Sequence, residues 1–343
     1  MRSFKFLIFL MGVSLIVFSL IGCSRKGKTI TKEENKPIRI AVEFVDHAAS
    51  ADIARAKGWY KAEGLKVEAF DNYITGMALA AALTRGDIDA AYICMIPAIS
   101  AFSNGGVKIK VVCGTHKYGY GLIVNPKRVK NVHDLLKSDV RVACPREGSP
   151  PDALMNKLIE RYNLDGKKLR EKVLRMPPPK IVLALEMGEI DAGFCCEQFP
   201  TMGESMGFRE IIKAEDLWPN MQGSVLVVKD RLIKEHPDIV RKLVKVTERG
   251  IDFVNKHPKE ASVIVARALS VAGKKVLPLK VGKIAGRLKI TPAVIEKSLT
   301  QKMIDTPSVD SASIQEEIDY MYKLGYIKKD FKAKEILDLS FLN

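Results

Sequence analysis

Five cysteines stand out among the residues that could do chemistry. Each comes at the end of a short apolar run, as in AAYIC, IKVVC, VRVAC and AGFCC; they are Cys94, Cys113, Cys144, Cys195 and Cys196. Their spacings match no zinc or iron–sulfur signature, and an odd number without a regular framework argues against a disulfide scaffold. We favour the interpretation that these small side chains pack at buried strand ends. The alternative is that several thiols line a cleft and meet a soft metal or a polarisable ligand.

Recognised catalytic motifs are lacking. The chain has no GxSxG, HExxH, P-loop or C-x-x-C motif, and GYG is too short for a nucleotide-binding fingerprint. An acidic segment that contains His47 does follow the first apolar run, and a histidine there could also be reactive. We expect a binding protein and not an enzyme, with no cofactor and no bound metal.

The elements that would position these residues begin at Ile38. IRIAVEFV, LKVEAF and IDAAYIC read as strands, and the two segments between them read as helices. Gly64 is expected to end the first helix, and the second should start after Thr75 as N-cap and stop before Gly86. Strands that alternate with helices predict parallel pairing through right-handed crossovers, and therefore an α/β unit.

In such sheets, small ligands bind beyond the carboxyl ends of the strands and near helix N-termini. The loops after Phe44, after Asn72 and around Cys94 are therefore expected to meet at one site. VKIKVVCGTHK reads as the following strand, and the segment from Thr115 to Gly121, within GTHKYGYG, has too much Gly and polar character for an element interior and is expected to be the first crossing to a second lobe.

The second lobe is expected to be an insertion in the first. LIVNP, VRVACP and KVLRMP alternate with predicted helices from about Val132, Ser149 and Pro178, and LWPNMQG reads as the return crossing. We predict lobe I at residues 38–118 and 222–343 and lobe II at 119–221, each a mainly parallel sheet flanked by helices, with a two-stranded hinge between them. From Lys234 onward the pattern is helical.

The first 22 residues resemble a lipoprotein signal peptide. Arg2 and Lys5 precede a short apolar run, and the LIGC that follows is similar to the lipobox of bacterial lipoproteins. We predict a leader at residues 1–22, a lipidated Cys23 carrying an acyl chain such as palmitate, and a flexible tether at residues 23–37. The alternatives are an ordinary signal peptide or a retained membrane helix. No later stretch is apolar enough to cross a bilayer.

The chain is basic, with a formal net charge of +15 over 343 residues. Its lysines are scattered among acidic neighbours, and Arg does not interleave with aromatic residues as it would on a nucleic-acid platform. We therefore predict no nucleic-acid partner. The charge is interpreted as a solvated surface that favours anionic lipid headgroups.

Several segments in order resemble the solute-binding proteins of ABC importers. GWYKAEGLKVE, TGMALAAALTRGDIDAAYI, LALEMGEIDAGFCCEQFP and KEHPDIVRKL are similar to the nitrate/sulfonate/bicarbonate group, which includes binders of thiamine-pyrimidine precursors. The resemblance implies a two-lobed type II periplasmic-binding fold that closes on a small molecule and docks on a permease with a cytoplasmic ATPase. It implies an extracytoplasmic location, and we expect a lipid-anchored monomer on the periplasmic side or the cell surface.

The resemblance carries site positions over only loosely. Relatives have a Trp-Glu-Pro sequence where this chain has CCEQFP, so Glu197 is kept while Cys196 replaces the aromatic residue. Backbone N–H groups at the start of the second helix would favour an anionic or oxygen-rich group. The predicted ligand-binding residues are Glu43, Asp46, His47, Thr75, Gly76, Cys94, Met95, Thr115, Ser149 and Glu197.

Charges around the predicted cleft suggest the class of ligand. Acidic residues outnumber Arg146 and Lys117 there, whereas a small oxyanion needs more cationic or N–H partners. We therefore favour a small organic molecule with donor groups, such as a pyrimidine, over nitrate or a sulfonate. Two other functions stay open: an enzyme of pyrimidine or thiamine-precursor metabolism with this fold, and a ligand-sensing lipoprotein.

Overall fold

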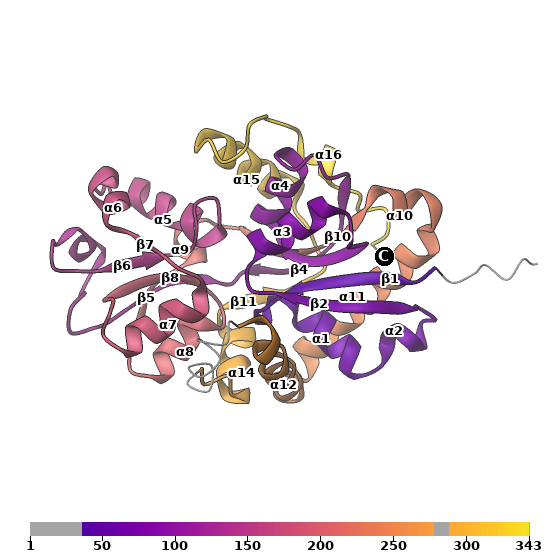
Figure 1. The fold of residues 1–343 in the computed structure, drawn as a ribbon, viewed down its shortest axis with the longest axis horizontal. Helices are drawn as coiled ribbons and strands as arrows, with labels where there is room; N and C mark the ends of the chain where they lie inside the picture. Colours follow the sequence, from indigo (N-terminus) through magenta and orange to yellow (C-terminus); the bar gives the residue numbers. More distant parts are fainter. Residues whose placement is uncertain (1–35, 278–287, 343) are drawn as a thin grey trace, which may run out of the picture. The chain divides into compact units, whose positions relative to one another are not determined.

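Two mixed β-sheets form the framework of the protein (Figure 1). The computed structural model describes residues 36–277 and 288–342. The predicted leader, Cys23 and most of the tether lie outside the described residues. The first sheet has the order β11-β4-β10-β3-β1-β2. Its strands are β1 (Ile38–Glu43), β2 (Val67–Tyr73), β3 (Ala90–Cys94), β4 (Ile109–Tyr118), β10 (Gln222–Lys229) and β11 (Met303–Asp305).

The second sheet has the order β7-β6-β8-β5-β9. Its strands are β5 (Tyr120–Val124), β6 (Val142–Cys144), β7 (Leu174–Arg175), β8 (Ala192–Cys196) and β9 (Arg209–Lys213). These strands all fall within the range predicted for lobe II, and those of the first sheet fall within the ranges predicted for lobe I. Contacts join the described residues into one compact unit, so the lobe boundaries stay a prediction.

The α/β class is confirmed, but the sheets are mixed and not mainly parallel. β1 pairs parallel with β2 and β3, while β10 and β4 are antiparallel to their neighbours. In the second sheet β6 pairs parallel with β7 and β8, while β5 is antiparallel to β8 and β9. The crossover helices explain the parallel part, whereas β5 and β10 enter their sheets directly from the other sheet.

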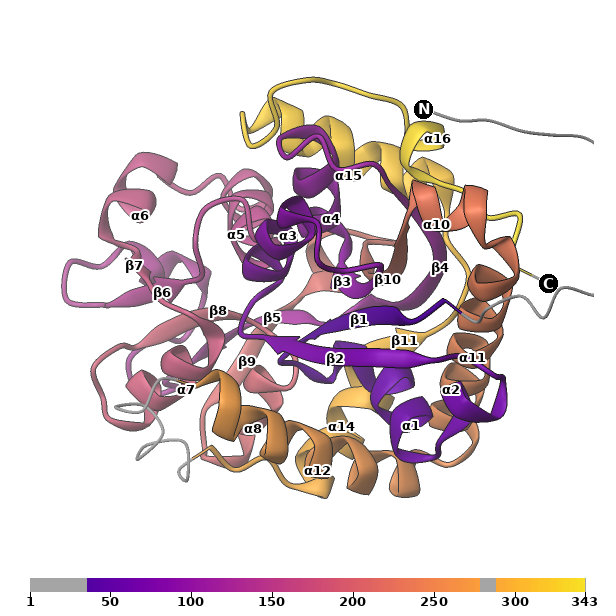
Figure 2. The same ribbon diagram turned by 45° about the vertical axis from the view of Figure 1, so that its right-hand side comes forward.

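Helices cover both faces of the first sheet (Figure 2). β1 lies between β2 and β3, so the two crossovers run in opposite directions, and their right-handedness places α1 (Ala49–Ala56) and α3 (Gly76–Arg85) on opposite faces. α4 (Met95–Ser103) lies on the α3 side, and α11 (Pro237–Lys256) packs against α1.

Of the other helices, α2 (Trp59–Ala62) follows α1 beside the first sheet, and the rest flank the second sheet or complete the C-terminal region. The two that follow β6 and β7 are α5 (Pro150–Arg161) and α7 (Pro178–Glu186). The rest are α6 (Gly166–Lys172), α8 (Phe199–Ser205), α9 (Ala214–Leu217), α10 (Asp230–Glu235), α12 (Pro258–Val276), α14 (Pro292–Gln301), α15 (Ser311–Lys323) and α16 (Ala333–Ile336), with 3₁₀ turns at Asp46–Ala48 and Val132–Leu136. Within residues 36–277 and 288–342, no helix is both long enough and apolar enough to cross a membrane.

Local signals placed α3 correctly. Thr75 is its N-cap and accepts a hydrogen bond from the Ala78 N–H at 3.2 Å, and Gly86 ends it with a positive φ of 100°. The first predicted helix is instead divided into α1 and α2. Gly58 adopts φ 69° between them, a left-handed conformation that interrupts the helix well before Gly64.

The chain passes from the first sheet to the second within GTHKYGYG, but the prediction that this stretch lies outside regular elements is wrong. β4 continues to Tyr118 and β5 starts at Tyr120, because this stretch forms ladder pairs with β10 on one side and β8 on the other. The turn between them is confined to Tyr118 and Gly119, which have φ values of 64° and 86°. Cys113 therefore lies in the interior of β4 and not at a strand end, unlike Cys94, Cys144 and Cys196.

Candidate functional site

A cavity of about 240 Å³ lies where the carboxyl ends of both sheets' parallel strands meet. Strand order reverses at β1 in the first sheet and at β6 in the second, and such points are where α/β sheets bind small ligands. The cavity lining is Glu43, Val45, Ile74, Thr75, Gly76, Met77, Cys94, Pro97 and Tyr120 from one side, and Pro145, Arg146, Ser149, Pro150, Pro151, Arg175, Met176, Pro177, Pro178 and Cys196 from the other.

The first group forms what we call the first wall, and the second group forms the second wall. At the base of the first wall, Glu43 ends β1 with its side chain only 5% exposed. Its Oε1 accepts the Cys94 N–H at 2.6 Å, and the Cys94 thiol donates to its Oε2 at 3.4 Å. Burial raises the pKa of Glu43 to about 7, while the N–H groups of Cys94 and Gly76 oppose that rise.

The Glu43 carboxyl therefore sits at two helix N-termini at once. Gly76 is the first residue of α3, and Cys94 is the N-cap of α4. A Cβ at Gly76 would lie 2.5 Å from Glu43 Oε1 and 2.8 Å from Pro97 Cγ, so only glycine allows this approach. The carboxyl occupies the position that a ligand anion would take at these termini.

The helix N-termini of the second wall are built differently. Pro150 and Pro151 are the first two residues of α5, and Pro178 and Pro179 are the first two of α7. Proline carries no N–H, so these termini lack the donors that helix starts usually offer. Their rings instead make this side of the cavity largely apolar.

Ser149 is the exception on the second wall. It is the N-cap of α5, as expected, but its side chain accepts no capping hydrogen bond. The side chain is 5% exposed, and its Oγ has no hydrogen-bond partner within the described chain. A buried hydroxyl without a partner is costly unless something else bonds to it. A ligand in the cavity would supply that bond.

Two arginines bring positive charge to the second wall, and only one of them is compensated. Arg175 donates to Asp152 Oδ1 at 2.6 Å and to the Pro145 carbonyl at 2.7 Å. Arg146 is exposed, and no side-chain partner for it is found among the described residues. Within the described chain, Arg146 therefore brings an unpaired positive charge to the second wall, whereas the first wall holds the Glu43 carboxyl.

A second layer of buried polar groups lies behind the first wall. His47 Nε2 is 3.0 Å from the Gly119 carbonyl, which makes it the protonated nitrogen, and Nδ1 is 3.5 Å from the Cys94 sulfur. Burial lowers the pKa of His47 well below its ordinary value and raises that of the Cys94 thiol well above it. Neither an imidazolium nor a thiolate is present here at neutral pH.

Five of the ten predicted site residues line the cavity: Glu43, Thr75, Gly76, Cys94 and Ser149. The other five, Asp46, His47, Met95, Thr115 and Glu197, are buried but are not in its lining. Glu197 Oε2 accepts the Thr201 hydroxyl at 2.7 Å, and Asp46 donates its N–H to Gln198 at 3.1 Å. Their ligand-binding roles stay predictions.

Sequence reasoning missed the apolar part of the site. It singled out none of Pro145, Pro177, Met77 or Met176, although the Pro-Pro pairs after two strands were a visible signal of donor-free helix starts. Of the cysteines, Cys94 and Cys196 line the cavity, while Cys113, Cys144 and Cys195 do not. Within residues 36–277 and 288–342, no cluster of three or more His, Cys, Asp or Glu could hold a metal ion.

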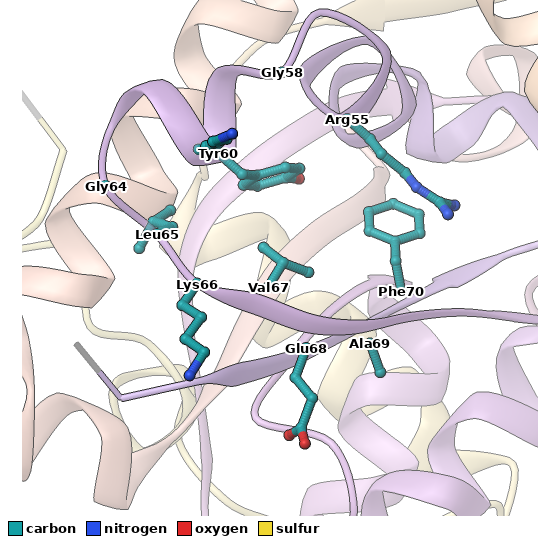
Figure 3. Close-up of a pocket in the computed structure, with 11 residues that line it drawn as sticks. Arg55, Gly58, Tyr60, Gly64, Leu65, Lys66, Val67, Glu68, Ala69 and Phe70 are labelled. Carbon is teal, nitrogen blue, oxygen red and sulfur yellow. The ribbon is translucent and has the colours of Figure 1, made fainter. Parts of the chain in front are cut away.

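A larger groove of about 640 Å³ runs along the outer edge of β2 (Figure 3). Arg55 stacks its guanidinium on the Phe70 ring at 4.6 Å, and Tyr60 bonds through its hydroxyl to Tyr92 at 3.1 Å. This groove is open to solvent, lies along a strand edge and not at the strand ends, and has no unpartnered buried polar group among its lining residues. The smaller cavity is the better candidate site.

Comparison with known proteins gives a family match that covers most of the chain. The model of the NMT1-like family matches residues 31–270. A candidate aliphatic sulfonates-binding protein of Bacillus subtilis (strain 168) is 23% identical over 340 residues, which cover 95% of this chain and 93% of that protein.

Two solved binding proteins have a similar fold. The alkanesulfonate-binding protein SsuA from Xanthomonas axonopodis pv. citri, bound to MOPS, has a TM-score of 0.70 at 16% identity and covers 88% of this chain and 98% of its own. The nitrate-binding protein NrtA from Synechocystis PCC 6803 has a TM-score of 0.68 at 13% identity, with 90% and 87% covered. At these identities the likeness establishes the periplasmic binding protein fold.

Proposed function

The chain belongs to the NMT1-like family, and from this premise we propose that it is an extracytoplasmic solute-binding protein of an ABC importer. It captures a small organic molecule in the cavity between the two sheets and delivers it to a membrane permease. The predicted lipid on Cys23 would hold it at the membrane. The sulfonate- and nitrate-binding proteins with this fold support the general role.

The residues around the cavity favour ligand binding over catalysis. Its only nucleophilic candidate with a nearby base is Cys94, among the residues that line it, and burial keeps the pKa of this thiol well above neutrality. His47 bonds to a backbone carbonyl and is not in the cavity lining. Residues from both sheets form the cavity, so a ligand that contacts both walls would favour the closed arrangement.

The observation that carries the ligand class is the proline pair at the start of each helix of the second wall: Pro150 and Pro151 of α5 line the cavity, as does Pro178, the first residue of α7, which Pro179 follows. They replace N–H donors by apolar rings, so nitrate or a sulfonate would find few donors there. An organic body would instead pack on the rings, with a polar group toward Ser149 and an acceptor toward Arg146. We propose a donor-bearing organic ligand such as a pyrimidine.

A thermal-shift screen followed by calorimetry tests this function. Residues 24–343 would be titrated with pyrimidines, amines, aromatic acids, ethanesulfonate, bicarbonate and nitrate. We expect one organic class to raise the melting temperature, since a ligand at about 100 times its Kd stabilises the native state by about 2.7 kcal/mol. Ser149→Ala should weaken that binding, whereas Ser270→Ala on α12 should not. Absence of binding by every compound, or binding unaffected by Ser149→Ala, would contradict the proposal.

A further inference from the structure

We infer that Glu43 is a specificity-determining residue: its carboxyl fills the oxyanion position at the start of α3 and α4 and so excludes sulfonates, nitrate and similar anions from this site. The inference rests on the proposed function, because it concerns the selectivity of the same cavity. It assigns to one residue the difference between this chain and an oxyanion binder.

The geometry of the first wall is the basis of this inference. α3 and α4 begin next to each other at the base of the cavity, and both are longer than two turns. Their first N–H groups are the natural place for an anion, because the helix dipole and the unpaired donors act together. Oε1 of Glu43 already takes the Cys94 N–H at 2.6 Å and lies close to Gly76.

Two physical effects then act against an incoming anion. The carboxyl occupies the donors, so an oxyanion would have to displace it from a buried position that is 5% exposed. When ionised, the carboxylate also repels the anion across a cavity of low polarity. The first effect does not depend on the protonation of Glu43, since a neutral carboxyl still fills the space.

The same carboxyl attracts a ligand of the opposite character. Its accepting oxygens belong to a cavity whose lining includes six prolines and two methionines beside a few polar residues. An N–H or O–H group of the ligand would replace the weak bond from the Cys94 thiol, which is 3.4 Å long. Ser149, on the opposite wall, offers a hydroxyl oxygen that has no partner among the described residues. A ligand that spans the cavity would bond to both the Glu43 carboxyl and the Ser149 hydroxyl.

Gain of a new binding activity is the decisive test. Glu43→Ala removes the carboxyl and leaves the N–H groups of Gly76 and Cys94 open to the cavity. We expect calorimetry to show at least about tenfold tighter binding of ethanesulfonate and nitrate by this variant than by the native protein, since charge-assisted hydrogen bonds are the strong ones. Glu43→Gln keeps the space filled and should show a much smaller gain.

Glu147→Ala is the matched charge control. Glu147 is near the cavity mouth with a side chain 74% exposed, and its removal deletes a carboxylate without uncovering a helix N-terminus. A gain confined to Glu43→Ala supports an occupied anion position, whereas equal gains in both variants would overturn it, because charge alone would then explain the selectivity.

A purely structural role for Glu43 would give destabilised variants with no gain for oxyanions, and this result would also overturn the inference. If Glu43→Ala does not fold, the affinities of the native protein provide the test. Ethanesulfonate or nitrate that binds the native protein as tightly as any organic compound in the panel would refute the exclusion. Oxyanion binding at least about tenfold weaker than that of the organic compound would support it. Native binding of an organic ligand without a gain in Glu43→Ala would leave the binding function standing while this inference falls. A gain in oxyanion binding by Glu43→Ala, with no compound bound by the native protein, would support this inference and contradict the proposed function.

Discussion

The two walls of the cavity deal with the same feature, the start of a helix, in opposite ways. On the first wall the starts of α3 and α4 keep the N–H groups of Gly76 and Cys94, and the Glu43 carboxyl occupies them. On the second wall the N-termini of α5 and α7 lose their first N–H groups to proline pairs. The arrangement on the first wall places an ionisable carboxyl in the protein interior, and the arrangement on the second wall does not. A helix N-terminus near a pocket is therefore no sufficient sign of an anion site.

Buried carboxyls at and behind the first wall predict a pH dependence of stability. Burial raises the pKa of Glu43 and Asp46 to about 7 and that of Asp305 to about 8, from 4.5, 3.8 and 3.8. The folded state therefore holds more protons than the unfolded chain above pH 4.5, and stability falls as pH rises through 7 and 8. The lowered pKa values of His47 and His116 act only below about 6.5.

Between about pH 6.5 and 8.5 we expect the free energy of unfolding to drop by on the order of 1 kcal/mol for each of these carboxyls, measured by urea denaturation. Glu43→Gln should reduce the drop by one such step. Stability that stays constant or rises over this range would contradict the interior charge of the first wall.

Gly76→Ala tests the close approach on the first wall. The added methyl would overlap Glu43 Oε1 and Pro97, and we expect a loss of about 1–3 kcal/mol of stability together with weaker ligand binding. Gly166 is the matched control, because it is also the first residue of a helix, and a Cβ there would meet the flexible end of Arg170 at 2.8 Å and Ile159 Cγ2 at 3.0 Å. Chemical denaturation of Gly166→Ala should give a smaller loss than that of Gly76→Ala. Equal losses in the two variants would show that Gly76 has no special role.

Thr75 and Ser149, the N-caps of α3 and α5, allow a comparison in which the expected changes in stability are smaller. Thr75 accepts the Ala78 N–H, so Thr75→Ala should cost about 1 kcal/mol of stability. Ser149 makes no such bond, so Ser149→Ala should leave the stability of the ligand-free protein nearly unchanged while it weakens ligand binding. Denaturation and calorimetry on both variants separate the two roles. A large stability loss in Ser149→Ala would mean that its hydroxyl has a partner in the protein.

Restoring donors to the second wall should have the smallest effect. Replacing Pro150 and Pro151 by alanine returns two N–H groups to the start of α5, and nitrate binding should improve about two- to fivefold, the range expected from a helix dipole. Pro237→Ala at the start of α11, remote from the cavity, is the control. A gain as large as that of Glu43→Ala would mean that the proline pairs, and not Glu43, decide against anions.

The parts of the fold that follow from local chemistry could be predicted from the sequence. Thr75 and Gly86 mark both ends of α3, because capping and a left-handed terminus act within a few residues. The turn between β4 and β5 could not be found in this way. Its Gly, His and Lys residues suit a loop, and they become strand only because β10, more than a hundred residues later, pairs with them.

The same limit applies to the site. Glu43 at a strand end and Ser149 at a helix start were predicted and do line the cavity, whereas Met95, the first residue of α4, does not. Asp46 and Glu197 lie within a few residues of strand ends but are buried outside it. Sequence position shows that a residue is near the edge of a sheet, whereas the direction of its side chain depends on turns and packing that the sequence pattern does not reveal.

A crystal structure of the native protein soaked in concentrated ethanesulfonate would test the central claim most directly. We predict that the Glu43 carboxyl stays bonded to the Cys94 N–H, with no sulfonate at the starts of α3 and α4. A sulfonate seated on the N–H groups of Gly76 and Cys94, with Glu43 turned away from them, would contradict the account.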